Sequence, residues 1–227
     1  NVLILEKEDI LGGNLNLFIH YGFGEYYLGE KVTGPELKSI LVEDFKKLGG
    51  IYKVNTRVLE INRDNVITYV NPNEGIVEIE AKAIILAAGC REKYTGNIMV
   101  PIHKYTGIFT VASAHRLVNF NGFLPEKEIV ISGSNIWTLI LARRLVLEGA
   151  KIKGIVTERK WFNRDELDLI NSFNIPIIYE SEVVEIDGEE KINLVKIKNK
   201  DKNEVIIVNC DCLVLSIGYF PEIDFLR

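Results

Sequence analysis

The chain has 227 residues, of which 47% are hydrophobic and 26% are charged, and its formal net charge is -5. That size suits one large or two small α/β domains, and the composition excludes a disordered chain and a membrane span. Interleaved charges argue against a nucleic-acid partner, and three cysteines argue against a secreted disulfide scaffold and favour the cytoplasm.

The first half predicts a parallel strand and helix followed by an antiparallel meander. Residues 2–5 form a short apolar run, which is typical of a strand covered on both faces. After a glycine- and aromatic-rich loop, Thr33-Gly34-Pro35-Glu36 opens a helix that ends near Leu48, before Gly49-Gly50. Three strands of a small meander are expected at 56–61, 66–70 and 76–80, and a buried strand at 83–88 ends at Gly89.

The second half predicts a βαβ order. A helix is expected at 113–119, then a strand at 129–131, a turn at Gly133-Ser134-Asn135 and a helix at 138–148. A strand at 151–156, a helix at 164–173 and a strand at 176–179 follow. A second meander is expected at 183–186, 193–199 and 205–209, and a buried strand at 213–217 ends at Gly218. Because both halves end in an apolar strand followed by glycine, the chain predicts a weak internal repeat.

Acidic residues and glycines beside these strands are candidates for nucleotide contacts. Glu6 and Glu158 each follow a predicted strand, where a carboxylate can accept hydrogen bonds from ribose hydroxyls, and Glu158 lies 25 residues after Gly133. Gly12 and Gly13 let backbone approach a ligand closely. The alternatives are solvated charges at strand ends and an ordinary turn. Arg159 and Lys160 are either contacts for a 2′-phosphate or part of a basic surface turn.

Several motifs together resemble one family. They are Glu6 with Gly12-Gly13, Asn16-x-x-Ile19-His20-x-Gly22-Phe23-Gly24, Thr33-Gly34-Pro35-Glu36, Ala87-Ala88-Gly89-Cys90-Arg91-Glu92 and Cys212-Leu213-x-Leu215-Ser216-x-Gly218-x-x-Pro221-Glu222. This set is similar to FAD-dependent flavoproteins of the pyridine nucleotide-disulfide oxidoreductase type. They include the FAD subunits of amine and proline dehydrogenases and of hydrogen cyanide synthase, and companions of glycerol-3-phosphate dehydrogenase.

The resemblance implies an α/β fold with two Rossmann-like dinucleotide-binding domains, each with a parallel sheet and a small antiparallel meander. Residues 1–112 plus 213–227 would form an FAD-type domain that is incomplete at its N-terminus, and residues 113–212 would form an NAD(P)-type domain. By the same resemblance, Glu6 would hold the FAD ribose and Gly12 and Gly13 would line the flavin side. Val58 would contact adenine through its backbone, and Ala88 and Gly89 would pass near the pyrophosphate.

The chain also departs from the family pattern. The FAD glycine motif is expected before Val2, so that segment was removed, lies outside this sequence or is supplied by another chain. In Gly133-Ser134-Asn135-Ile136-Trp137-Thr138 only the first glycine of the second fingerprint remains. NAD(P)H binding in the usual mode is therefore doubtful, although Gly133 and Glu158 remain candidate contacts. The C-terminal flavin segment of larger relatives would follow Arg227.

Cysteine and histidine positions do not identify a catalytic residue. No Cys-x-x-Cys pair is present, so the redox dithiol of disulfide reductases is not expected. Cys210-Asp211-Cys212 has no nearby histidine, and no metal site is expected there. His20 either faces a flavin or substrate or is structural. No acid or base can be named from the sequence.

The sequence leaves three functional hypotheses. The first is a subunit of an FAD-dependent dehydrogenase that passes electrons from an amine, amino acid or polyol phosphate through flavin to an acceptor. That reading expects a partner dehydrogenase subunit or other hetero-oligomer. The second is a non-catalytic scaffold subunit with degenerate nucleotide sites, favoured by Asn135 and Thr138. The third is a nucleotide-binding module with one ligand.

Overall fold

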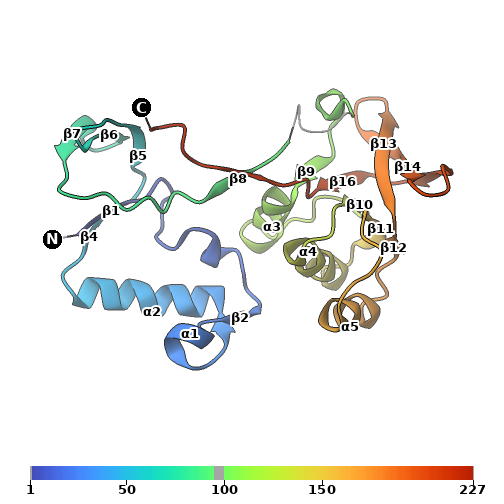
Figure 1. The fold of residues 1–227 in the computed structure, drawn as a ribbon, viewed down its shortest axis with the longest axis horizontal. Coiled ribbons are helices and arrows are strands. Elements are labelled where there is room, and N and C mark those ends of the chain that lie inside the picture. The colour runs from blue at the N-terminus through green and yellow to red at the C-terminus, as the bar shows by residue number, and fades with distance from the viewer. Residues whose placement is uncertain (1, 95–99, 227) are drawn as a thin grey trace. The chain divides into compact units, whose positions relative to one another are not determined.

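A computed structural model describes residues 2–94 and 100–226. The chain divides into two compact units (Figure 1): unit 1 is Asn1–Gly89 with Pro221–Arg227, and unit 2 is Cys90–Phe220. The sequence predicted domain boundaries at 112/113 and 212/213, whereas the boundaries between the two units lie at 89/90 and 220/221. Residues 90–112 and 213–220 thus lie in unit 2. The strands at 108–110 and 212–215, next to the predicted boundaries, both belong to the central sheet of this unit.

Unit 1 contains a parallel strand pair, a long helix and a meander. Strands β1 (Leu3–Leu5) and β4 (Ile51–Lys53) pair in parallel, and helix α2 (Gly34–Lys47) lies between them in the chain. The meander is antiparallel, with β5 (Arg57–Ile61), β6 (Val66–Asn71) and β7 (Gly75–Glu80). The loop after β1 holds the short elements η1 (Gly13–Asn16), β2 (Tyr21–Phe23), α1 (Glu25–Leu28) and β3 (Val32–Thr33). The predicted strand, helix and meander are present, but β1 is not covered on both faces as expected, since Leu3 is 38% exposed; β4 was not predicted.

The prediction of a buried strand at 83–88 is wrong. This segment has no assigned helix or strand, and Ile85 is 92% exposed. An apolar run forms a buried strand only where neighbouring strands pair with its backbone and other side chains cover it. Within the described residues, no strand pairs with 83–88.

Helix α2 begins with a reciprocal cap. The Thr33 hydroxyl accepts from the backbone N–H of Glu36, and the Glu36 carboxylate accepts from the backbone N–H of Thr33 at 2.8 Å. Thr33→Ala is expected to destabilise the helix start by about 0.5–2 kcal/mol, because it leaves a first-turn N–H without its partner. Hydrogen exchange at the Glu36 amide measures this loss. Ser39→Ala, which changes an exposed hydroxyl inside the same helix, should leave that amide unchanged.

Unit 2 is a three-layer α/β unit. Its parallel sheet has the order β12-β11-β10-β16-β9. The strands are β9 (Ile108–Thr110), β10 (Glu128–Ser132), β11 (Lys151–Val156), β12 (Ile177–Ile178) and β16 (Cys212–Leu215). The helices are α3 (Val111–Asn119), α4 (Ile136–Leu147) and α5 (Arg164–Ser172), and the second meander comprises β13 (Ser181–Gly188), β14 (Ile192–Asn199) and β15 (Val205–Asn209). The remaining elements are η2 (Ile102–Lys104), β8 (Cys90–Glu92) and β17 (Tyr219–Pro221), of which β8 and β17 pair.

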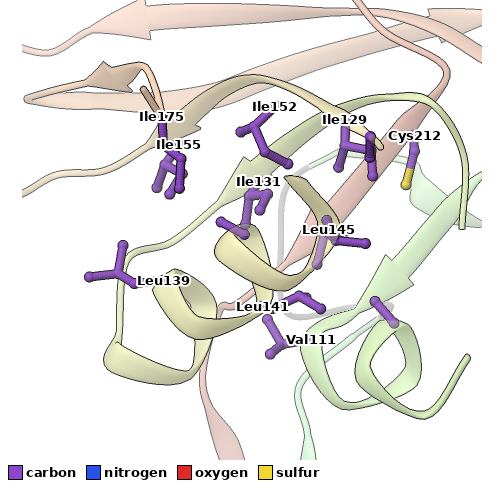
Figure 2. Packing of buried hydrophobic residues seen from close by; sticks show 14 of the residues in the cluster. Val111, Ile129, Ile131, Leu139, Leu141, Leu145, Ile152, Ile155, Ile175 and Cys212 are labelled. Atoms are coloured by element: carbon purple, nitrogen blue, oxygen red, sulfur yellow. The ribbon is translucent and has the colours of Figure 1, made fainter. Parts of the chain in front are cut away.

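Two apolar cores cover the two faces of this sheet. Alternate residues of β10 explain the division: Ile129 and Ile131 join the core on the helix side, and Val130 joins the core on the meander side. Figure 2 shows the helix-side core, in which Leu139, Leu141 and Leu145 of α4 pack with the sheet residues. The sequence-based expectation of an α/β fold with parallel sheets and antiparallel meanders is confirmed. No helix in residues 2–94 and 100–226 has the length and apolar character required to cross a membrane.

Candidate functional site

In unit 1, Glu6 lies where β1 ends. Its backbone N–H donates to the Lys53 carbonyl at 2.9 Å, which continues the parallel pairing with β4, and its carbonyl accepts from the Thr56 N–H at 2.8 Å. The Oε1 atom accepts from the backbone N–H of Glu8 at 2.9 Å. In the described residues Oε2 has no protein hydrogen-bond partner. The carboxylate is therefore held at the strand end, and within the described part of the chain one of its oxygens accepts no hydrogen bond.

The two glycines after Glu6 have different surroundings. Gly12 and Gly13 both have positive φ, at 112° and 49°. A Cβ on Gly12 would overlap the Lys38 side chain, so packing against α2 explains this glycine. A Cβ on Gly13 would have no heavy atom within 4 Å. Gly13 therefore leaves backbone open to a ligand, whereas Gly12 already has a structural reason to be glycine.

The remaining predicted contacts of unit 1 lie on two segments. Val58 is half-buried on β5, opposite Tyr69 of β6, two residues after the Thr56 N–H that donates to Glu6. Ala88 is exposed, and Gly89 has φ 75° with no heavy atom within 4 Å of a Cβ. The hydrogen bond from the Thr56 N–H to the Glu6 carbonyl thus joins the end of β1 to the segment that leads into β5, which carries Val58. No hydrogen bond in the described residues joins Ala88 or Gly89 to Glu6.

In unit 2, the Gly133 turn lies at the carboxyl end of β10. Gly133 has φ 108°, its N–H donates to the Val156 carbonyl at 2.8 Å, and a Cβ there would overlap the Ser216 carbonyl. The next residue, Ser134, is connected to Thr157 by a hydroxyl contact of 2.6 Å. Gly133 and the loop that carries Glu158 therefore meet at one edge of the sheet.

Asn135 caps helix α4 with its own side chain. The Oδ1 atom accepts from the Thr138 N–H at 3.0 Å, and Nδ2 donates to the Ser216 hydroxyl at 2.8 Å and to the Tyr219 hydroxyl at 3.3 Å. In a nucleotide-binding turn, backbone N–H groups at this helix start face phosphate. The asparagine therefore uses one of these N–H groups internally.

Glu158 and Arg159 follow β11, and both are engaged. Glu158 is exposed, and its carboxylate forms an ion pair with Lys200 at 3.0 Å. Arg159 donates to Glu166 of α5 through Nη1 at 2.9 Å and through Nη2 at 2.8 Å. Glu166 was not identified from the sequence as a site residue. Its spacing from Asn163 is that of a capping box, and this was the signal in the sequence.

We expect Glu166 to make the stability of unit 2 fall in acid. Hydrogen bonds from Arg159 hold the pKa of the Glu166 carboxyl below its usual range, and burial opposes this more weakly. A lowered pKa in the folded state stabilises the fold above the unfolded pKa, and this stabilisation is lost as pH falls through the folded pKa. Glu166→Gln should therefore flatten the decline in urea stability below about pH 5, since Gln does not titrate. An unchanged pH slope would contradict this prediction.

A second engaged carboxylate, Glu92, lies at the start of α3. It accepts from the Ala112 N–H at 2.9 Å. Burial raises the pKa of Glu92, and hydrogen bonds from Thr110 and the first-turn amides of α3 oppose this effect. The sequence showed Glu92 only as part of a motif, because its approach to α3 depends on how β8 is placed in unit 2.

The cysteines are not arranged as a redox pair. Cys210 belongs to the meander-side core and Cys212 to the helix-side core, so their side chains lie on opposite faces of the sheet. Burial raises the pKa of Cys210 to about 11 and raises the pKa of Cys212 further. Both thiols are therefore neutral near pH 7, and Cys90 is exposed. His20 packs with the rings of Phe18 and Phe23, at centroid distances of 5.8 Å and 5.2 Å.

Comparisons with known proteins place the chain in a family. The family pattern described as pyridine nucleotide-disulphide oxidoreductase matches residues 17–227. A thioredoxin reductase of Borreliella burgdorferi is 28% identical over 202 residues, which cover 86% of this chain and 59% of the relative. A ferredoxin–NADP reductase of Picrophilus torridus is 24% identical over 221 residues, which cover 96% of this chain and 65% of the relative. The chain thus spans about three-fifths of these proteins.

Solved structures show the same fold. A thioredoxin reductase of T. acidophilum matches with a TM-score of 0.77 and 23% identity, over 100% of this chain and 71% of that one. An L-proline dehydrogenase of P. horikoshii matches with a TM-score of 0.64 and 18% identity, over 99% of this chain and 38% of that one. Since the family pattern matches more than half of its residues, the chain belongs to the pyridine nucleotide-disulphide oxidoreductase family of FAD-dependent proteins.

Proposed function

We propose that the chain is a subunit or part of an FAD-dependent oxidoreductase, with flavin held by unit 1. The observation that carries this proposal is the Glu6 carboxylate at the end of a parallel strand, with one oxygen that no described residue binds, in a member of an FAD-dependent family. A carboxylate in that position can accept hydrogen bonds from ribose hydroxyls. Bound FAD supplies the redox chemistry, while the chain positions it and tunes its surroundings.

The described residues of unit 1 fit part of an FAD site. Gly13 and Gly89 both have positive φ and open space where a Cβ would point, so their backbones can approach a ligand. In this proposal Glu6 binds the ribose, Gly12 and Gly13 line the flavin side, Val58 contacts adenine through its backbone, and Ala88 and Gly89 lie near the pyrophosphate. Gly133 and Glu158 fit a nucleotide less well, because Asn135 and Lys200 already bind the groups around them.

The chain's own thiols favour a substrate that is not a disulfide. The relatives named thioredoxin reductase are similar in sequence, but this sequence has no Cys-x-x-Cys, and two of its three cysteines are buried neutral thiols. We therefore propose that the electron donor is an amine, an amino acid or a polyol phosphate. Its oxidation would take place together with a partner dehydrogenase subunit. Free cysteines are in keeping with a cytoplasmic protein.

Asn135 favours a second candidate function, a non-catalytic scaffold with degenerate nucleotide sites. Its side chain accepts a hydrogen bond from the Thr138 N–H at the start of α4, a position where backbone N–H groups would otherwise bind a nucleotide phosphate. The complex purified from its source separates the two candidates. Flavin absorbance supports the oxidoreductase, whereas a colourless complex with its partner chain present supports the scaffold. Bleaching of the flavin by NADH would show that unit 2 binds nucleotide despite Asn135.

Glu6→Gln tests the proposed ribose contact in the flavin-loaded complex. Removal of the charge should weaken flavin binding by about 10- to 100-fold, because hydrogen bonds to charged groups contribute about 1.5–3 kcal/mol. Release of flavin on dilution, followed by fluorescence, measures the change. Glu43→Gln removes an exposed charge from α2 of the same unit and should leave flavin binding unchanged. Equal retention by Glu6→Gln and the native chain would refute the ribose role.

A further inference from the structure

The side chain of Arg159 contacts the turn between β10 and α4 in unit 2. Its Nη1 atom donates to the Ser134 carbonyl at 3.2 Å, one residue after Gly133. Its guanidinium also lies 4.3 Å from the ring centroid of Phe162, and its backbone N–H donates to the Thr157 hydroxyl at 3.1 Å. The guanidinium is thus fixed beside the loop that follows the second strand of the arrangement, where the ribose of a dinucleotide lies in folds of this class.

The carboxylate of Glu166 binds the guanidinium of Arg159. Both of its oxygens accept hydrogen bonds from Arg159, and Oε2 also accepts from the Asn163 N–H at 2.9 Å. The side chain of Glu166 is only 10% exposed, compared with 36% for Arg159. Because the capping box of α5 fixes this carboxylate, its position does not depend on a ligand.

The other charges of this loop are engaged elsewhere. Lys160 pairs with Glu180 at 2.8 Å and with Asp201 at 3.5 Å, and Lys200 pairs with Glu158 at 3.0 Å. Arg159 is therefore the cation of the loop that faces the Ser134 turn. A two-pronged guanidinium binds a carboxylate and a phosphate with the same geometry, so a carboxylate can occupy the place of a phosphate.

We propose that Glu166 is an internal substitute for a ribose 2′-phosphate and makes unit 2 discriminate against 2′-phosphorylated nucleotides. Glu166 accepts the hydrogen bonds of Nη1 and Nη2 of Arg159, which a 2′-phosphate would otherwise accept, and its negative charge repels the phosphate. This is a specificity-determining role, exerted through Arg159. All the residues concerned lie in unit 2, so flavin binding by unit 1 can succeed or fail independently of this proposal.

Calorimetric titration with 2′-AMP tests the proposal in the full chain. Glu166→Gln removes the charge but keeps an amide oxygen at the capping position, which suits both Glu and Gln. We expect 2′-AMP to bind this variant about tenfold or more tightly than the native chain, and adenosine to change by less than about twofold. The matched control Asp165→Asn removes an exposed charge from the same first turn of α5 as Glu166, and should give less than about a twofold change for 2′-AMP.

Three outcomes would overturn the proposal. One is a folded Glu166→Gln chain that shows no gain for 2′-AMP. Another is an equal gain for 5′-AMP, which would show general anion attraction rather than recognition of the 2′-position. The third comes from the double variant Arg159→Met/Glu166→Gln. If the gain depends on the guanidinium, the double variant should bind 2′-AMP about tenfold or more weakly than Glu166→Gln alone, so an equal gain in both would show that Arg159 does not bind the phosphate.

Discussion

Gly133→Ala is expected to lower the stability of unit 2 by about 2–6 kcal/mol. Two separate costs contribute to this loss. The backbone at Gly133 has φ 108°, which a residue with a side chain adopts only with strain of about 1–3 kcal/mol. The added Cβ would also overlap the Ser216 carbonyl oxygen, and such overpacking typically costs about 1–3 kcal/mol. Because the Gly133 N–H and the Ser132 carbonyl hold adjacent strands, the turn cannot move freely to relieve the overlap.

Urea unfolding followed by tryptophan fluorescence measures this effect, since both tryptophans, Trp137 and Trp161, lie in unit 2. Gly149→Ala is the matched control. Gly149 also has positive φ, at 91°, but a Cβ there would meet no heavy atom within 4 Å. The control should therefore show the backbone cost alone. Equal losses in the two variants would show that the overlap with Ser216 contributes nothing.

Leu141→Ala is expected to cost about 2–5 kcal/mol in the same assay. Leu141 is 0% exposed and belongs to the helix-side core, so truncation removes buried apolar contacts and leaves a cavity. Figure 2 shows it on α4 in the cluster of buried hydrophobic residues. The helix-side core is built on a parallel sheet fixed by backbone hydrogen bonds, which limits how far the cavity can collapse.

Leu147→Ala makes the identical chemical change on the same helix. Leu147 is 57% exposed, so its truncation should change stability by less than about 0.5 kcal/mol. The difference between the two variants isolates burial, because helix propensity changes equally in both. Similar losses would mean that α4 does not present Leu141 to the core.

Local sequence patterns determined most of the secondary structure. The expected strand at 151–156 coincides with β11, and α2 and the first meander lie where turn residues and apolar alternation placed them. Glycine and capping residues end these elements through backbone geometry and short-range hydrogen bonds, which depend on neighbours in sequence. The candidate positions Glu6, Gly13 and Gly133 followed from the same local rules at strand ends.

Only the tertiary structure decided which of those positions are available to a ligand. The sequence identified Arg159 and Asn135 as residues near the predicted site. It did not show that the Glu166 carboxylate binds the Arg159 guanidinium, or that the hydroxyls of Ser216 and Tyr219 accept hydrogen bonds from the Asn135 side chain. It also predicted a buried strand at 83–88, which depends on partner strands that local pattern does not specify. Local chemistry fixes where a chain turns and which side chains face a strand end. Hydrogen bonds between residues distant in sequence determine whether those side chains are already engaged, because these contacts form only when the sheet and helices assemble.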